Sequence, residues 1–209
     1  MGNAFVENLH KYWFRACVVG VIFGAIGVGA ALLLPIQYRA DVDILLIARS
    51  RVGSDPYTTV KSAERVAENL AEVIGSSDFF SKVKAQTGYD LDWSRYDNRS
   101  ALERRRLWQK TVTAQVLYGT GVLRVSAYSN PINQAEKMAA AIADAMVNRG
   151  GEYTSGDVGM KIINEPVASK FPARPNLVAF FVLGFVLGFL VVIFWTKKKN
   201  NISKDSYYA

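Results

Sequence analysis

The sequence predicts an α+β domain, a small sheet with helices on one face, held between two transmembrane helices. Two uncharged, mostly apolar runs of about 20 residues near the ends of the chain predict the membrane helices. Between them, hydrophobic residues recur with the periods of both strands and helices. Hydrophobic residues are 50% and charged residues 21% of the 209, which excludes a disordered chain and a protein built wholly of membrane helices.

The two runs cover residues 16–36 and 177–196. A helix of that length is roughly 30 Å long, enough to cross a bilayer core. Lys11 and Arg15 precede the first run, and four lysines follow the second. The positive-inside rule therefore places residues 1–15 and the basic tail, 197–209, in the cytoplasm, and residues 37–176 outside it. A cleaved signal peptide is the alternative for the first run, but its apolar stretch exceeds the usual ~7–15 residues.

The net charge of +7 is shared between the parts of the chain. The terminal segments carry six basic and two acidic residues, hence +4. The outer segment carries the remaining 19 basic and 16 acidic residues, hence +3. More than half of the excess is thus a topology signal, and nucleic acid is not implied as a partner.

The first half of the outer segment predicts one strand and three helices. Alternating apolar residues predict a strand over 38–48, followed by a loop at 50–56. A stripe from Val60 to Ile74 predicts a helix over about 58–74, with Glu64 among the charged residues off the stripe. Ser77 is the expected cap of a short helix ending near residue 88. Ser100 and Glu103 form a capping-box pattern for a third helix that ends near residue 110.

The second half predicts a hairpin, a helix and a last strand. Gly119-Thr120-Gly121 separates two expected strands, 111–118 and 121–128. Asn130 is the expected cap of the next helix, with Pro131 at its first position. Its stripe ends at the glycine pair at 150–151, and a strand is expected around 160–164. Because the first and last strands both adjoin a span, the sheet is expected near the membrane.

These segments together resemble the Wzz-type chain-length determinants, or polysaccharide co-polymerases, and their Gram-positive relatives that modulate capsule tyrosine kinases. The resemblance covers nearly the whole chain in the same order. It is carried by the strand at 38–46, the helices at 57–71 and 130–145, the hairpin strand at 119–127, and above all the proline-rich run of Pro166 and Pro172-Ala-Arg-Pro175-Asn before the second span. The sequence departs from the family pattern in two ways. The helical arm has only about 22 residues, which argues against a tall bell-shaped assembly. No nucleotide-binding domain follows the second span, which argues against autonomous kinase activity.

The resemblance implies a non-enzymatic scaffold in the bacterial cytoplasmic (inner) membrane. It would form a ring-like homo-oligomer and contact a polysaccharide polymerase or flippase and a lipid-linked glycan. Its role would be to regulate chain length, polymerisation or export of O-antigen, capsule or exopolysaccharide, with no cofactor. One alternative is that the tail modulates a separate cytoplasmic tyrosine kinase. A second is an extracytoplasmic sensor, which would need a pocket with convergent polar groups.

The prolines and glycines are the candidate coupling and packing residues. Proline fixes φ and donates no backbone hydrogen bond, so this run predicts a stiff, extended exit. The resemblance implies that this exit couples the outer domain to the second span, and the alternative is an ordinary linker. Small residues four apart let membrane helices approach closely, either between the two spans or between subunits. The candidates are Pro166, Pro172 and Pro175 for coupling, and Gly20, Gly24, Gly184 and Gly188 for helix packing.

Other charged or polar motifs are weaker candidates. Arg104, Arg105 and Arg106 suit contact with a polysaccharide phosphate or another subunit, although three consecutive helical residues point in three directions and a solvated face is favoured. Trp108 is expected in the core. Asp90, Asp92 and Asp97 lack the spacing of a calcium loop, so no metal site is expected. The one histidine and one cysteine lie at the N-terminal end, so no catalytic triad is expected in the outer domain.

Overall fold

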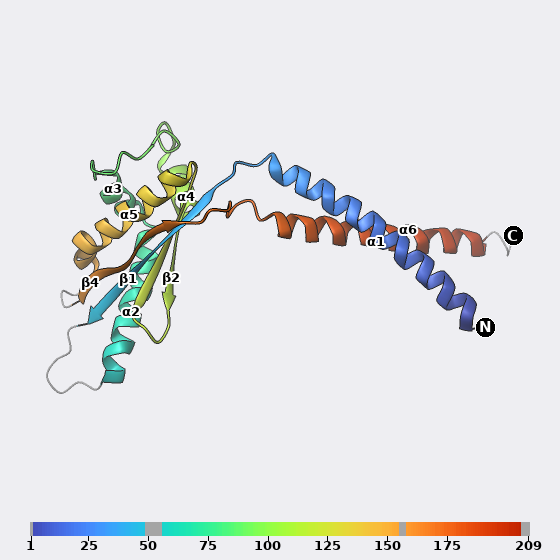
Figure 1. Cartoon of the computed structure of the whole chain (residues 1–209), viewed down its shortest axis with the longest axis horizontal. Coiled ribbons are helices and arrows are strands. Elements are labelled where there is room, and N and C mark those ends of the chain that lie inside the picture. Colours follow the sequence, from blue (N-terminus) through green and yellow to red (C-terminus); the bar gives the residue numbers. More distant parts are fainter. Residues whose placement is uncertain (1, 49–55, 155–157, 206–209) are drawn as a thin grey trace. The chain divides into compact units, whose positions relative to one another are not determined.

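The computed structural model describes residues 2–48, 56–154 and 158–205 of the chain (Figure 1). It divides into two compact units. One unit contains the two terminal helices, and the other, Gln37–Ala173, contains the sheet and the remaining helices. The loop expected at residues 50–56 lies outside the described residues, apart from Pro56, which opens a helix.

The terminal helices are α1, Gly2–Leu32, and α6, Leu177–Asp205. Each contains a stretch long and apolar enough to cross a membrane, Trp13–Leu32 in α1 and Leu177–Trp195 in α6. Helix α1 ends four residues before the expected end of the first span, and a tighter turn follows in which the amides of Leu33 and Leu34 bond three residues back. Pro35 explains this end, because proline disfavours a helical conformation in the residue before it.

The sheet has four antiparallel strands in the order β2-β3-β1-β4 (Figure 1). They are β1, Tyr38–Ala48; β2, Val112–Leu117; β3, Val122–Ser129; and β4, Val158–Ala168. The first and last strands are therefore neighbours. Strand β4 is longer than expected and contains Pro166, which the sequence had suggested for the linker. An edge strand tolerates proline, and the register of β4 shifts opposite Asp41 and Asp43.

The helices of the second unit are close to those expected. They are α2, Pro56–Ile74; α3, Ser77–Lys84; α4, Ala101–Thr111; and α5, Ile132–Arg149, which a short 3₁₀ helix η1, Gly150–Tyr153, follows. The capping box of Ser100 and Glu103 is confirmed. The cap expected for α3 was wrong by one residue, because the hydroxyl of Ser76, not that of Ser77, accepts a hydrogen bond from the amide of Phe79. The helix also ends at Lys84, four residues before the expected end near residue 88. The cap expected for α5 was wrong by one residue. The cap position is held by Pro131 rather than Asn130, and no side chain makes a capping hydrogen bond there.

The core lies on one face of the sheet. Alternate residues of β1, from Ala40 to Leu46, are at most 3% exposed and join a single cluster with residues of α2 and α5. On the opposite face, Thr113 and Gln115 of β2 and Lys161 of β4 are exposed. The expected arrangement, a small sheet with helices on one face, is thus present in the described part of the chain.

An aromatic cluster holds α4 against the rest of this unit. Trp108 is fully buried, as expected, and its ring packs on Phe80 and Tyr96. The indole Nε1 donates a 2.7 Å hydrogen bond to the carbonyl of Ile74, the last residue of α2. Trp108 therefore caps the carboxyl end of α2 and fixes α4 beside it.

Candidate functional site

We call Gln37–Ala173 the sheet unit. The segments by which the chain enters and leaves this unit are joined by backbone hydrogen bonds. The amide of Ser169 donates to the carbonyl of Arg39 over 2.8 Å, and that of Ala173 donates to the carbonyl of Gln37 over 2.9 Å. Residues 169–173, which leave the sheet, thus continue beside residues 37–39, which enter it. We call these two stretches the paired connectors. They are fixed to one another rather than free linkers.

The three candidate prolines fall at different places along the outgoing chain. Pro166 lies inside β4, Pro172 is exposed within the paired connectors, and Pro175 follows a cis peptide bond after Arg174. The next residue, Asn176, caps α6 because its side-chain oxygen accepts the amide of Ala179 over 3.1 Å. Hydrogen bonds of β4, of the paired connectors and of Asn176 fix parts of the outgoing chain, whereas the coupling role of the prolines stays a prediction.

The candidate glycines line the contact between α1 and α6. A Cβ atom on Gly20 would lie 3.0 Å from the Phe185 ring, and one on Gly24 would lie 2.8 Å from the Phe181 ring. Both distances are shorter than an ordinary van der Waals contact. The absence of a side chain lets phenylalanines of α6 lie directly on the backbone of α1.

The glycines of α6 face α1 in the same way. A Cβ atom on Gly184 would overlap the carbonyl oxygen of Phe23 and lie 3.0 Å from the Cα of Gly24. One on Gly188 would lie 2.8 Å from the Cβ of Phe23. Because the obstacles at Gly184 are backbone atoms, no side-chain rotation can relieve them. Gly29 of α1, by contrast, has nothing within 4 Å, and it provides a matched control position.

The arginine run occupies two sides of α4. Arg104 is half-buried with its guanidinium 6.0 Å from the centre of the Phe80 ring, whereas Arg105 and Arg106 are exposed. The three side chains do not converge on one point, so they form no phosphate fork by themselves. The nearby acidic residues are engaged locally: Asp90 pairs with Lys137 over 3.4 Å and Asp97 with Lys84 over 2.9 Å.

A polar cluster that sequence reasoning missed lies on the open face of the sheet. Arg124 of β3 donates two hydrogen bonds, of 2.8 and 2.9 Å, to the carboxylate of Asp43, and the amide of Asn164 donates a third of 2.8 Å. These bonds, chiefly those from Arg124, lower the pKa of Asp43 in spite of its burial. The cluster links the three neighbouring strands β3, β1 and β4. Its members meet only because of the register in which these strands pair.

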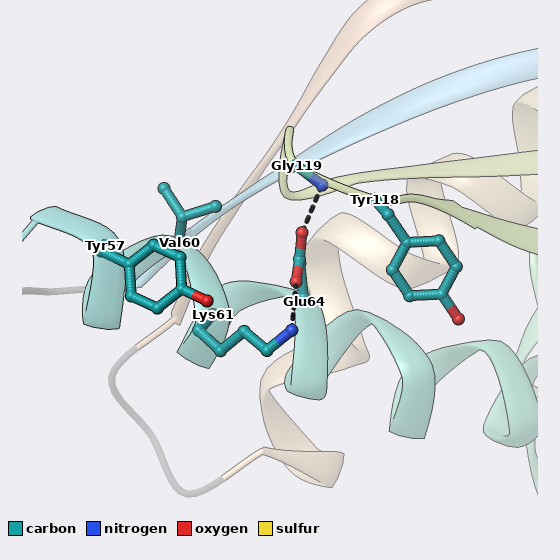
Figure 2. A pocket seen from close by; sticks show the side chains of 6 residues that line it. All are labelled: Tyr57, Val60, Lys61, Glu64, Tyr118 and Gly119. Atoms are coloured by element: carbon teal, nitrogen blue, oxygen red, sulfur yellow. Dashed lines mark hydrogen bonds and ion pairs between the residues drawn. The ribbon is translucent and has the colours of Figure 1, made fainter.

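The described part of the chain also contains a cleft of about 510 Å³ at the hairpin end of the sheet (Figure 2). Tyr57 and Tyr118 stand on its two sides and are 72% and 70% exposed. Glu64 lies between them, accepts the amide of Gly119 and pairs with Lys61 over 3.5 Å.

The cleft corrects two expectations for α2. Glu64 is buried rather than on the solvated face, and Val60, expected in the core, is 40% exposed at the cleft. Near its amino-terminal end, α2 lies against the hairpin turn, where Glu64 bonds to Gly119. The side of α2 that is buried at this end therefore differs from the side that carries the apolar stripe.

In comparisons with known proteins, the chain matches no protein-family model and no curated protein.

Proposed function

We propose that the chain is a non-enzymatic scaffold of the bacterial cytoplasmic membrane that regulates chain length, polymerisation or export of a surface polysaccharide. Helices α1 and α6 cross the membrane with both termini in the cytoplasm, and the sheet unit lies outside. The protein acts as a homo-oligomer beside a polymerase or flippase. The resemblance described above motivates the polysaccharide, and the geometry supports the scaffold.

One observation carries the proposal: the strands that lead to the two apolar helices are neighbours and remain hydrogen-bonded through the paired connectors. A displacement of the sheet unit is then transmitted to both helices together, because hydrogen-bonded strands resist independent movement. The glycine contact between α1 and α6 gives the helices the close packing that such transmission requires. The mechanism is geometric, and no residue makes or breaks a bond.

The test is the size distribution of surface polysaccharide in a deletion strain complemented with variants. We expect deletion to shift or abolish the modal length and wild type to restore it. Pro172→Ala/Pro175→Ala loosens the outgoing connector and should restore it only in part. Gly184→Val drives a side chain into the backbone of α1 and should fail, whereas Gly29→Val on an open surface of α1 should restore the distribution. A distribution that deletion leaves unchanged refutes the proposal.

The cleft supports a second candidate, an extracytoplasmic sensor of a small ligand. Two exposed tyrosines facing a buried carboxylate and a lysine are the combination of apolar surface and directed polar groups found in ligand sites. Lys61→Ala/Tyr118→Ala removes the lysine and one of the two tyrosines without touching the paired connectors. Under the scaffold proposal this variant restores the modal length fully, and a variant that behaves like the deletion favours the sensor.

A further inference from the structure

The outward side of α4 is strongly basic. The helix carries Arg104, Arg105, Arg106 and Lys110 against one acidic residue, Glu103, whose carboxylate is engaged with Ser100 in the capping box. The side chains of Arg105 and Arg106 form no ion pair or hydrogen bond within the described residues. Leu102, one turn before Arg106 on the same side, is 59% exposed. We call Leu102, Arg105, Arg106 and Lys110 the arginine face.

This face belongs to the end of the sheet unit at which the chain enters and leaves. Helix α4 runs directly into β2, whose first residue, Val112, pairs with Ala127, and Ala127 also pairs with Ala40 near the start of β1. The hairpin turn lies at the opposite end of these strands (Figure 1). Only residues 33–37 separate the end of α1 from β1, and the chain cannot reach more than about 20 Å across them.

The paired connectors add a second exposed apolar side chain at this end. Phe171 is 79% exposed, and its neighbour Lys170 is exposed as well. The hydrogen bond from Ala173 to Gln37 holds this segment at the start of β1. Apolar side chains beside exposed cations suit contact with lipid headgroups, because the apolar groups can enter the interface while the cations stay at the phosphates.

We propose that this end of the sheet unit rests on the outer surface of the membrane, with Arg105 and Arg106 bound to phosphates of anionic lipids and with Leu102 and Phe171 at the interface. The inference rests on the proposed membrane location of α1 and α6, and not on the polysaccharide. Guanidinium groups suit phosphate oxygens, and each cation at an anionic surface increases the bound population by roughly fivefold. Such contact would orient the sheet unit on the membrane, to which its covalent connectors already attach it.

The experiment uses the full chain reconstituted into vesicles. In a Cys17→Ser background, which removes the one native cysteine, a nitroxide is attached at Leu102→Cys, and a matched probe at Tyr118→Cys reports the hairpin end. Collision of the nitroxide with oxygen, which concentrates in lipid, is compared with collision with a water-soluble nickel chelate. The vesicles contain phosphatidylcholine alone or phosphatidylcholine with phosphatidylglycerol.

We expect phosphatidylglycerol to make the probe at residue 102 severalfold less accessible to the nickel chelate, and salt to reverse this change. Arg105→Gln/Arg106→Gln should abolish the response, and the probe at residue 118 should stay in water throughout. Each variant must give the circular dichroism spectrum of wild type, which shows that it is folded. If the Leu102→Cys variant does not, Gln109→Cys on the same side of α4 provides a second probe position.

Four results would overturn the inference. Equal accessibility of residue 102 in both kinds of vesicle removes the lipid contact. A change of oligomeric mass in the double variant without a change in probe accessibility assigns the face to a second copy of the chain. Competition by inorganic phosphate in solution assigns it to a free anion. A chain that alkaline carbonate strips from the vesicles refutes the membrane location itself, which separates that failure from the others.

Discussion

Replacing Trp108 by phenylalanine tests how α4 is held in place. The variant keeps an aromatic ring in the cluster with Phe80 and Tyr96 but removes the indole N–H that bonds to the carbonyl of Ile74 over 2.7 Å. That carbonyl belongs to the last residue of α2, where a helix has no internal donor for it. The change therefore leaves a buried acceptor without its partner.

Two contributions set the size of the effect. A buried carbonyl that loses its hydrogen bond costs about 1–3 kcal/mol. The smaller ring also removes roughly three buried ring atoms, worth about 2 kcal/mol at the usual value for a methylene-sized group. The free energy of unfolding should thus fall by about 3–5 kcal/mol, a decrease in Tm of roughly 6–20 °C for a chain of this size.

Thermal unfolding of the detergent-solubilised full chain, followed by near-ultraviolet circular dichroism, measures this decrease. Trp93→Phe is the matched control, because Trp93 contacts the same aromatic cluster but is only half-buried, and its indole donates no hydrogen bond to the described residues. Its Tm should fall by only a few degrees. A Trp108→Phe variant that unfolds within about 3 °C of Trp93→Phe would refute the capping role of the indole.

Three further variants probe the sheet unit by the same thermal assay. Arg124→Gln leaves the buried carboxylate of Asp43 with fewer donors and should cost about 1–3 kcal/mol. Since the pKa of Asp43 is lowered in the folded state, wild type should keep this stabilisation above about pH 4 and lose it as the pH falls further, whereas Arg124→Gln should lose less. Glu64→Gln weakens the contact with Gly119 and should cost about 1 kcal/mol, with no loss contradicting that role. Ser100→Ala removes the capping box and should cost about 0.5–2 kcal/mol, and unchanged stability would contradict the cap.

Local signals in the sequence predicted the elements because each depends on a few adjacent residues. The capping box at Ser100, the glycines of the hairpin and the alternation over 38–48 all act within one element. Gly119 and Gly121 have positive φ, which glycine adopts without strain. The error at Ser76 has the same origin, since two adjacent serines offer equivalent caps and only the backbone decides between them.

Features that depend on strand order could not be predicted in this way. The cluster of Asp43, Arg124 and Asn164 joins residues up to 121 positions apart, and its members meet only in the register of three particular strands. The burial of Glu64 likewise depends on where the hairpin turn meets α2. Proline in β4 was read as the end of regular structure, but an edge strand with shifted register accommodates it.

The same strand order determines what the candidate residues can do. Had β4 paired at the far edge of the sheet beside β2, the chain would enter and leave on opposite sides, and the two apolar helices would be moved independently. In the observed order, β1 and β4 are neighbours and the paired connectors prolong their contact beyond the sheet. Under the proposed scaffold function, prolines that stiffen one connector would act on both helices, because the other connector is hydrogen-bonded to it. Under the same proposal the glycines would extend this coupling into α1 and α6, where Gly184 lies against backbone atoms of α1 that no side-chain rotation can move away.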